Sequence, residues 1–404
     1  MDPAWRLCMV TSVNCMIVTC MYTLSPYIVL KFGTTTNREA VGFWSGFIVA
    51  SFFLARALTL PLWGSLADKT NRTHIVVASL LLTGSGMFGC GFSMSLQGVG
   101  AYRLAIGACS AVHASCCALG FQLSGNRGSA IVESGFSLGR LFGPGLAGML
   151  LQIPLPACLT NFPLFWPCAI IAACQLLVIP LVPWAPSNRD AKSSLLTENT
   201  NNETNNFDQR RAAMTAQALS AGFVIISVAM EEAFVLYGIG SLGIHPSSVG
   251  YVYLQAGIWD LFLQNAILLN MVKKATSAQL YRLRWYALAC YAAPVIGLPF
   301  AVPHAGPFWL RIGLLGVCCG VRNAIAFIIF VTNISLLNEA SQGAVATAQS
   351  IRMAIGSACQ VVGPPVGAVF YAKFATWGLA FPLDHHFPFL VAAVASLVLA
   401  CLAS

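Results

Sequence analysis

Long apolar runs alternate with short polar segments along the whole chain. Twelve runs are long enough to cross a bilayer, since a spanning helix needs about 20 mostly apolar residues to traverse a hydrocarbon core of about 30 Å. In the first half they are Leu7–Leu30, Val41–Leu62, His74–Ser95, Gln97–Leu119, Ser129–Leu151 and Thr160–Val182. In the second half they are Ala213–Leu236, Ser247–Val272, Gln279–Val302, Pro307–Leu337, Gly343–Tyr371 and Phe387–Leu402. The pattern predicts an all-α membrane protein with twelve transmembrane helices.

One long segment interrupts these runs. Residues 183–212 include the polar stretch TENTNNETNNFDQRR and show no apolar periodicity, which is typical of a flexible linker. We therefore expect an N-terminal six-helix half over 1–182, a cytoplasmic linker over 183–212 and a C-terminal six-helix half over 213–404.

Composition and charge agree with this architecture. Of 404 residues, 57% are hydrophobic and 8% are charged, and the mean hydropathy is +0.76, which excludes an ordinary soluble domain. Lys and Arg are retained on the cytoplasmic side of membranes. If both termini are placed in the cytoplasm, the loops on the opposite side of the membrane contain only three basic residues, Lys31, Arg38 and Lys373. The basic residues are spread over separate loops, so we expect a lipid bilayer and no nucleic acid as partner.

The shortest polar connection, Gly64–Thr73, reads GSLADKTNRT and joins two apolar runs. Together with the preceding run it resembles the second helix and following loop of the major facilitator superfamily. The similarity is strongest to the branch of plant zinc-induced facilitator-like proteins and drug:proton antiporters. The shared residues are Gly46, Ser51, Phe52, Arg56, Ala57, Leu58, Thr59, Trp63, Gly64, Ala67, Asp68 and Lys69, with Arg103, Gly107, Gly139, Gly143, Pro144, Gly148, Gly363 and Pro364 further along.

The resemblance spans essentially the whole chain and implies particular roles. It implies a cytoplasmic gate motif made of Gly64, Asp68, Lys69 and Arg72, and a part for Arg103 in proton coupling. The family loop usually has glycine where this chain has Asn71, and asparagine can adopt the left-handed conformation that such a glycine would take. The cysteine-rich and Pro-Glu-Thr-x-His signatures of the plant facilitators are absent, so a zinc-linked substrate is not supported.

Two glycine-rich and proline-containing runs occupy corresponding places in the two halves. The fifth run carries Gly139, Gly143, Pro144 and Gly148, and the eleventh carries Gly363, Pro364 and Gly367. Small residues allow helices to approach closely, and proline bends a helix. The correspondence favours a transporter built from internal repeats.

Charged residues inside the apolar runs are the candidate site, because burying a charge in a membrane costs at least about 2.5–3.5 kcal/mol. The candidates for proton coupling or for lining a cavity are Arg56, Arg103, Glu133, Arg140, Glu231, Glu232, Asp260, Arg322 and Arg352. Glu133 and Arg140 lie about 10 Å apart along one helix, so each needs a partner elsewhere. Glu231 or Glu232 is the favoured titrating carboxylate and Asp260 the second choice. The alternative is that these charges form structural ion pairs.

The excess of buried arginines favours an anionic or zwitterionic organic solute. We expect secondary active transport by alternating access, with proton-coupled antiport preferred, in a monomer. A facilitative uniporter, or a transporter-like receptor or scaffold without a transport cycle, is the alternative. We expect no enzyme activity, no cofactor and no metal, and interpret Asp384, His385 and His386 as a solvated loop. The sequence leaves open the solute, the direction, the stoichiometry, and the choice between the plasma membrane and a vacuolar or other endomembrane.

Overall fold

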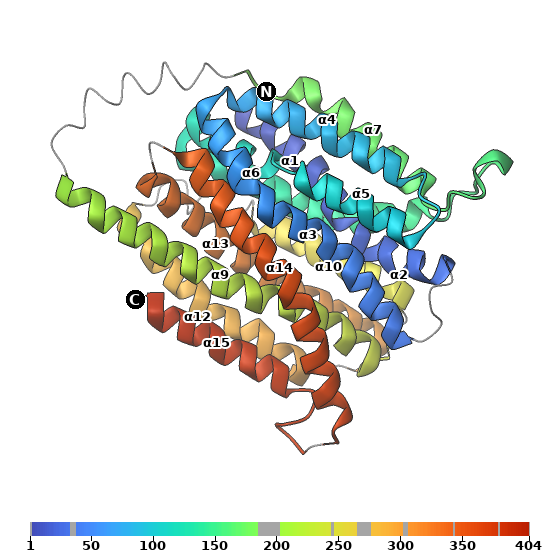
Figure 1. Cartoon of the computed structure of the whole chain (residues 1–404). Helices are drawn as coiled ribbons and strands as arrows, with labels where there is room; N and C mark the ends of the chain where they lie inside the picture. Colours follow the sequence, from blue (N-terminus) through green and yellow to red (C-terminus); the bar gives the residue numbers. More distant parts are fainter. Residues whose placement is uncertain are drawn as a thin grey trace. The chain divides into compact units, whose positions relative to one another are not determined.

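The chain folds into helices throughout the part that the structure, a computed structural model, describes. That part comprises residues 2–32, 38–184, 203–243, 246–264, 276–301, 306–341, 344–378 and 380–403, and it contains no strand. The helices are α1 (Pro3–Thr19), α2 (Met21–Lys31), α3 (Arg38–Lys69), α4 (Arg72–Cys90), α5 (Leu96–Ala108), α6 (Val112–Leu150), η1 (Ala157–Leu159), α7 (Phe165–Leu177), η2 (Ile179–Leu181), α9 (Glu203–Gly240), α10 (Pro246–Leu263), α12 (Ser277–Ala301), α13 (Phe308–Ala340), α14 (Val345–Thr376) and α15 (Phe387–Ala403) (Figure 1). The all-α prediction is confirmed.

Within the described ranges, seven helical stretches are long and apolar enough to cross a membrane, and three shorter apolar helices accompany them. One of the seven, Leu96–Leu150, contains both the fourth and the fifth predicted spans. They are separated inside α6 at Ser124 and Gly125, where the helical dihedrals are interrupted. Gly125 has a φ of 59° and a ψ of −150°, a combination that glycine adopts without steric cost. The chain reverses there, so the two parts of α6 form a hairpin.

Helix α9 begins at Glu203 and not at Ala213, where apolar periodicity starts. The end of the predicted linker is therefore helical. Glutamate, glutamine and arginine are good helix formers, and they extend α9 beyond its apolar part without adding an apolar face. Residues 185–202, which make up most of the remaining linker, lie outside the described residues.

Two compact units make up the chain. Unit 1 comprises Met1–Ala216 and Ile334–Val361, and unit 2 comprises Gln217–Asn333 and Val362–Ser404. In unit 1, α1 packs on α6, α3 on α5, and α4 on α7, and their ribbons run side by side in Figure 1. In unit 2, α12 packs on α15. These units differ from the predicted six-helix halves, and the division into halves stays a prediction.

Glycines of α6 lie directly against α1. A Cβ at Gly139 would collide with the carbonyl oxygen of Ser12, and one at Gly143 with the hydroxyl of Thr19. At Gly148 a Cβ would make ordinary contact, 3.4 Å from Thr23. The carbonyl of Pro144, inside α6, accepts a 3.0 Å hydrogen bond from the Thr23 hydroxyl. Helices α1 and α6 can approach this closely because these α6 positions lack large side chains.

Glycines of α14 lie in the same way against α9. A Cβ at Gly367 would collide with the carbonyl oxygen of Ala229, and one at Gly363 would lie 3.3 Å from the Val228 side chain. Pro364 is half-buried within α14. In each predicted half, therefore, the glycine-rich helix packs on the first helix of that half.

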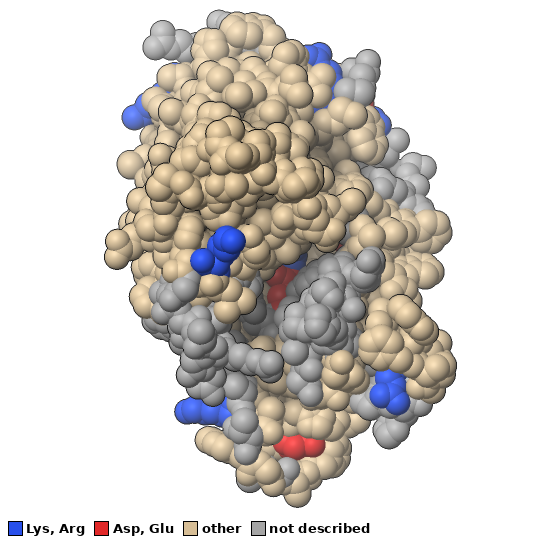
Figure 2. Space-filling view, turned by 90° about the vertical axis from the view of Figure 1, so that its right-hand side faces the viewer, with Lys and Arg blue, Asp and Glu red and all other residues tan. Residues whose placement is uncertain are grey.

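Large apolar side chains remain exposed along regular stripes. On α3, Leu54, Leu58 and Leu62 follow at four-residue intervals and are 49%, 71% and 71% exposed. Val362 and Val366 of α14 are more than half exposed. Figure 2 shows a face on which most described atoms are uncharged, with charged side chains at only a few places. Exposed surface of this kind suits contact with lipid.

Candidate functional site

A buried carboxylate in unit 1, that of Glu133, has ionisable neighbours from two helices. Its Oε2 shares a 3.0 Å hydrogen bond with Nε2 of His113 and lies 3.9 Å from Nη2 of Arg352. The Sγ of Cys117 lies 3.9 Å from the same oxygen. His113 and Cys117 belong to the first part of α6 and Glu133 to the second. The reversal at Gly125 therefore brings together residues that are twenty positions apart.

The imidazole of His113 is held in place by stacking. Its ring lies 4.3 Å from that of Phe136 at an angle of 8°, and only 4% of the residue is exposed. Glu133 is 6% exposed. A buried ionisable pair of this kind has to be compensated by its surroundings, since solvent screens it little.

Two guanidinium groups provide that compensation. Arg352 of α14 donates from Nε to the side-chain oxygen of Gln349 at 2.9 Å, besides facing Glu133. Arg56 of α3 is 4% exposed, donates from Nη2 to the Met353 sulfur at 3.6 Å, and interacts electrostatically with Glu133. We call Arg56, His113, Glu133 and Arg352 the inner cluster. Two arginines against one carboxylate leave capacity for a further anionic group.

A chain of amides and a hydroxyl supports the inner cluster. Gln349 donates to Asn338 at 2.6 Å, and Asn338 donates to the Ser129 hydroxyl at 3.1 Å. The Ser129 hydroxyl in turn donates to the backbone carbonyl of Cys117 at 3.0 Å. The orientation of Arg352 is thus connected by hydrogen bonds to both arms of the α6 hairpin.

The predicted gate motif forms a second polar centre of unit 1. Asp68 pairs with Arg72 at 3.0 Å and accepts the backbone N–H groups of Ala346 and Thr347 at 3.2 and 2.7 Å. These two residues open α14, so the carboxylate satisfies N–H groups that a helix start leaves unpaired and meets the positive end of the helix dipole. A larger residue at Gly64 would collide with Ser350.

The other parts of the motif have distinct surroundings. Arg72 also donates to the side-chain oxygen of Gln122 at 3.1 Å, whereas Lys69 is exposed. Asn71 corrects an expectation: its φ is −81° and its ψ 122°, which is extended and not left-handed. Its side chain accepts the backbone N–H of Thr73 at 2.9 Å. Asparagine acts here as the N-cap of α4. Glycine has no side chain and could not make this capping hydrogen bond.

Arg103 lies among different groups of unit 1. It is fully buried, donates to the backbone carbonyl of Ile17 at 3.0 Å, and lies 4.5 Å above the Phe52 ring. Arg140 is half-buried in the second part of α6. The contacts described for the inner cluster come from α3, α6 and α14, and they do not involve Arg103.

Unit 2 contains the remaining candidates. Glu231 of α9 lies 3.8 Å from Nη2 of Arg322 of α13, which is 3% exposed. Asp260 of α10 accepts a 2.7 Å hydrogen bond from Gln264 and is 7% exposed. The side chain of Glu232 lies outside the described residues.

A second carboxylate flanked by imidazoles occurs in the loop between α14 and α15. Asp384 Oδ1 lies 2.7 Å from Nδ1 of His386, and Oδ2 lies 3.5 Å from Nδ1 of His385. We call these three residues the loop triad. Burial alone would raise the pKa of Asp384, but hydrogen bonds from His386 and the charges of both imidazoles outweigh it and lower that pKa. Burial lowers the pKa of His385, as does neighbouring His386, against the opposing effect of Asp384.

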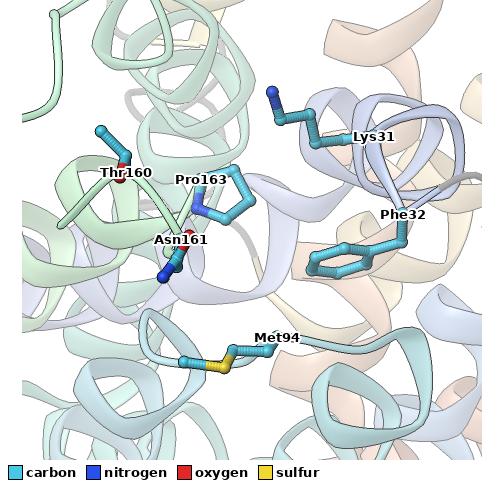
Figure 3. Close-up of a pocket in the computed structure, with 6 residues that line it drawn as sticks. All are labelled: Lys31, Phe32, Met94, Thr160, Asn161 and Pro163. Carbon is cyan, nitrogen blue, oxygen red and sulfur yellow. The ribbon is translucent and has the colours of Figure 1, made fainter.

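A pocket of about 350 Å³ lies elsewhere in unit 1. The end of α2, the loop after α4 and the segment before α7 line it, and Figure 3 shows their side chains around the opening. The lining residues are Lys31, Phe32, Met94, Thr160, Asn161 and Pro163. None of the predicted site residues is among them, so this pocket is separate from the inner cluster.

Reasoning from the sequence missed His113, the residue nearest to Glu133. A single histidine in an apolar run gives a weak signal. The stronger signal was Cys117 one helical turn later, because residues four apart share a face, together with Gly125 as the point where the chain reverses.

Comparisons with known proteins agree with this fold. The model of the Major Facilitator Superfamily matches residues 7–348. A probable peptide/nitrate transporter of Arabidopsis thaliana is 23% identical over 397 residues, which cover 87% of this chain and 80% of that protein. The protein ZINC INDUCED FACILITATOR 1 of the same plant is 26% identical over 197 residues, which cover 45% of this chain and 39% of that protein.

A solved structure supports the same architecture. The crystal structure of the human organic anion transporter MFSD10 (TETRAN) matches with a TM-score of 0.70 at 17% identity, and the match covers 100% of both chains. At this identity the likeness shows the fold. Together the comparisons confirm the resemblance carried by the Gly64–Thr73 segment.

Proposed function

Because the chain belongs to the major facilitator superfamily, we propose that it is a secondary active transporter of a small anionic or zwitterionic organic solute. It works by alternating access with protons as the coupling ion, and antiport is the preferred mode. The observation that carries this proposal is the inner cluster, in which Glu133 shares a 3.0 Å hydrogen bond with His113 and faces Arg352. A buried carboxylate that is kept in a membrane helix is a functional residue by default.

Glu133 is the group that takes the proton in this proposal. Glu231, Glu232 and Asp260 are the competing assignments. Glu133 is shared between the imidazole of His113 and the guanidinium groups of Arg56 and Arg352, and Glu231 faces the guanidinium group of Arg322 at 3.8 Å. A proton or a cationic group arriving at Glu133 therefore changes the balance of several charges at once, as a coupling site requires.

A zwitterionic solute fits this cluster best. Its carboxylate would bind the guanidinium groups of Arg56 and Arg352, which offer planar, charge-assisted donors. Its ammonium group would bind Glu133. Solute and proton then compete for one carboxylate, which is the condition for exchange. A purely anionic solute would bind together with the proton and would give cotransport.

The remaining assignments follow the family resemblance. Asp68 and Arg72 hold the cytoplasmic gate through the start of α14, Arg103 contributes to coupling, and both termini are cytoplasmic. The protein acts as a monomer in the bilayer. The chain has the 3.0 Å Asp68–Arg72 pair that such a gate requires.

The proposal is tested with purified protein in liposomes that contain a pH dye. Anionic, zwitterionic and cationic solutes are added from outside, to wild type and to Glu133→Gln, Glu231→Gln, Glu232→Gln and Asp260→Asn. We expect zwitterions to evoke proton movement opposite to their own, and this signal to vanish in Glu133→Gln alone. Flux without a proton signal would identify a uniporter, and binding without flux a receptor. Loss of the signal in Glu231→Gln alone would move the proton site to unit 2.

A further inference from the structure

We propose that the loop triad binds a divalent transition metal ion of the zinc type. The proposal concerns unit 2 alone and goes beyond the transport function. One donor atom from each of Asp384, His385 and His386 lies within 4.8 Å of the other two. Two imidazoles and one carboxylate are a donor set that zinc sites in proteins use, with further positions left for water.

The spacing of the donor atoms suits one shared ion. Zinc binds nitrogen and carboxylate oxygen at about 2.0–2.2 Å, so tetrahedral ligands lie roughly 3.3–3.5 Å from one another. Nδ1 of His385 lies 3.5 Å from Oδ2 of Asp384, and Nδ1 of His386 lies 2.7 Å from Oδ1, so the two imidazoles face the two oxygens of one carboxylate. The 2.7 Å contact is a hydrogen bond. An ion would take the place of the proton in this bond once the carboxylate oxygen and the imidazole nitrogen move apart by less than about 1 Å.

Aromatic rings on neighbouring elements hold both imidazoles. The His385 ring stacks on Tyr237 of α9 at 6.1 Å and 23°. The His386 ring contacts Phe300 of α12 at 4.9 Å and Phe381 of its own loop at 5.6 Å. Rings packed in this way lose little further freedom when they coordinate an ion, so the site is partly preorganised.

Access and charge distinguish this triad from a second donor cluster found in the described part of the chain. His113, Cys117 and Glu133 also bring three donor atoms within 4.8 Å. The residues of that cluster are buried, however, and Arg352 lies 3.9 Å from its carboxylate, so a dication would be repelled. Asp384, His385 and His386 have side chains that are 23%, 31% and 16% exposed. Among the described residues, the ion pairs of Asp384 are those with its two histidines.

The donor types also set the selectivity. Imidazole favours Zn²⁺, Cu²⁺, Ni²⁺ and Co²⁺, whereas Mg²⁺ and Ca²⁺ prefer sites made of oxygen. We therefore expect Zn²⁺ and Co²⁺ to bind and Mg²⁺ to be without effect at the same concentration.

Titration of the purified full-length chain with Co²⁺ tests the site, because the visible spectrum of Co²⁺ reports its ligands. We expect the absorption bands of Co²⁺ bound to nitrogen and oxygen, without a sulfur charge-transfer band. These bands should disappear when added Zn²⁺ displaces the bound Co²⁺. Loss of a residue that only hydrogen-bonds to a metal ligand costs about 10–100-fold in metal affinity. Removing two direct ligands in His385→Gln/His386→Gln should therefore weaken binding by at least about 100-fold. Asp384→Asn, a milder change, should weaken it by about tenfold or more.

Two further variants serve as controls. His74→Gln removes a histidine of unit 1 whose ring makes an edge-to-face contact with Trp184, and Cys117→Ser removes the sulfur of the buried cluster. Neither variant should change the titration. Size-exclusion chromatography checks that each variant is folded. Unchanged Co²⁺ affinity in both loop variants would overturn the proposal, as would a sulfur charge-transfer band that disappears in Cys117→Ser. No solute is used, so the result is independent of the proposed transport function.

Discussion

The inner cluster and the loop triad place similar groups in different surroundings. Each has a carboxylate hydrogen-bonded to imidazole, at 3.0 Å for Glu133 and 2.7 Å for Asp384. Glu133 is buried and faces a guanidinium group, whereas Asp384 is partly exposed and is flanked by two histidines. Positive charge beside a carboxylate disfavours a metal ion but leaves room for a proton or a solute anion. Under the two proposals, the surroundings of each carboxylate, more than the residue types beside it, decide which cation each site takes.

The largest expected effect comes from removing the positive charge of the inner cluster. In Arg56→Gln/Arg352→Gln the cluster of His113, Cys117 and Glu133 should become able to bind Co²⁺. Like charges about 4 Å apart cost roughly 4 kcal/mol at an effective dielectric constant of 20, and each 1.4 kcal/mol is tenfold. We therefore expect affinity at this cluster to rise by at least about 100-fold.

The measurement is again the Co²⁺ spectrum, made in a background of His385→Gln/His386→Gln so that only the buried site is seen. A sulfur charge-transfer band should appear when the arginines are replaced. If the folded quadruple variant gives no such band, the guanidinium groups are not what excludes metal, and the comparison fails.

The next effect separates the two carboxylates in transport. A pH difference of one unit can drive about tenfold accumulation of a solute exchanged for one proton, since it corresponds to 1.36 kcal/mol. Glu133→Gln should abolish this accumulation because an amide cannot bind the proton, whereas Asp384→Asn should retain it. Uptake of labelled solute into acid-loaded proteoliposomes measures both. Equal accumulation in wild type and Glu133→Gln would remove Glu133 from the coupling mechanism.

A third prediction tests whether Arg352 must be oriented. Gln349→Leu removes the acceptor of its Nε hydrogen bond, which is 2.9 Å long. Hydrogen bonds to charged groups contribute about 1.5–3 kcal/mol, so the KM for the solute should rise by about tenfold or more while the number of protons per solute stays constant.

Initial rates at several solute concentrations give this KM. Gln97→Leu, at an exposed position of α5, is the matched control and should leave it unchanged. An unaltered KM in Gln349→Leu would mean that Arg352 does not bind the solute.

The smallest effect concerns the metal-free loop triad and pH. Burial lowers the pKa of His385 in the folded protein, with a further contribution from His386 against that of Asp384. Below about pH 6.5, His385 therefore takes up a proton more readily in the unfolded chain than in the folded chain. Stability should therefore fall slightly as pH decreases from 7.5 to 5.5. The lowered pKa of Asp384 changes stability only at more acidic pH, below the ordinary pKa of an aspartate near 4.

Thermal unfolding with a chelator present measures this trend. His385→Gln should have a flatter pH dependence than wild type over the same range. An equal slope in the two proteins would show that His385 is not the group responsible.

Much of the fold could be predicted because a membrane imposes strong patterns. Apolar runs of fixed length indicated the helices, and the segment Gly64–Thr73 indicated the short connection between α3 and α4. The start of α9 at Glu203 could not be predicted in this way, because a polar helix outside the bilayer has no apolar periodicity. Likewise, Asn71 was expected to replace a glycine conformation, and its capping hydrogen bond to Thr73 became visible only in the structure.

The candidate site was predictable only in part. Buried charges such as Glu133 and Arg352 stand out in apolar runs, because their cost in a membrane demands an explanation. Which of them meet depends on tertiary packing: His113 joins Glu133 through the reversal at Gly125, and Arg352 joins through the packing of α14. Sequence spacing alone favoured Glu231 or Glu232 for the proton, since adjacent acids are conspicuous there.

Proton release on solute binding is the most direct test that solute and proton compete at Glu133. Purified protein in weakly buffered detergent solution, with a pH dye, is mixed with a zwitterionic solute, for wild type, Glu133→Gln and Glu231→Gln. The account predicts proton release in wild type and Glu231→Gln and none in Glu133→Gln, although that variant is folded. Release that persists in Glu133→Gln and disappears in Glu231→Gln would contradict it.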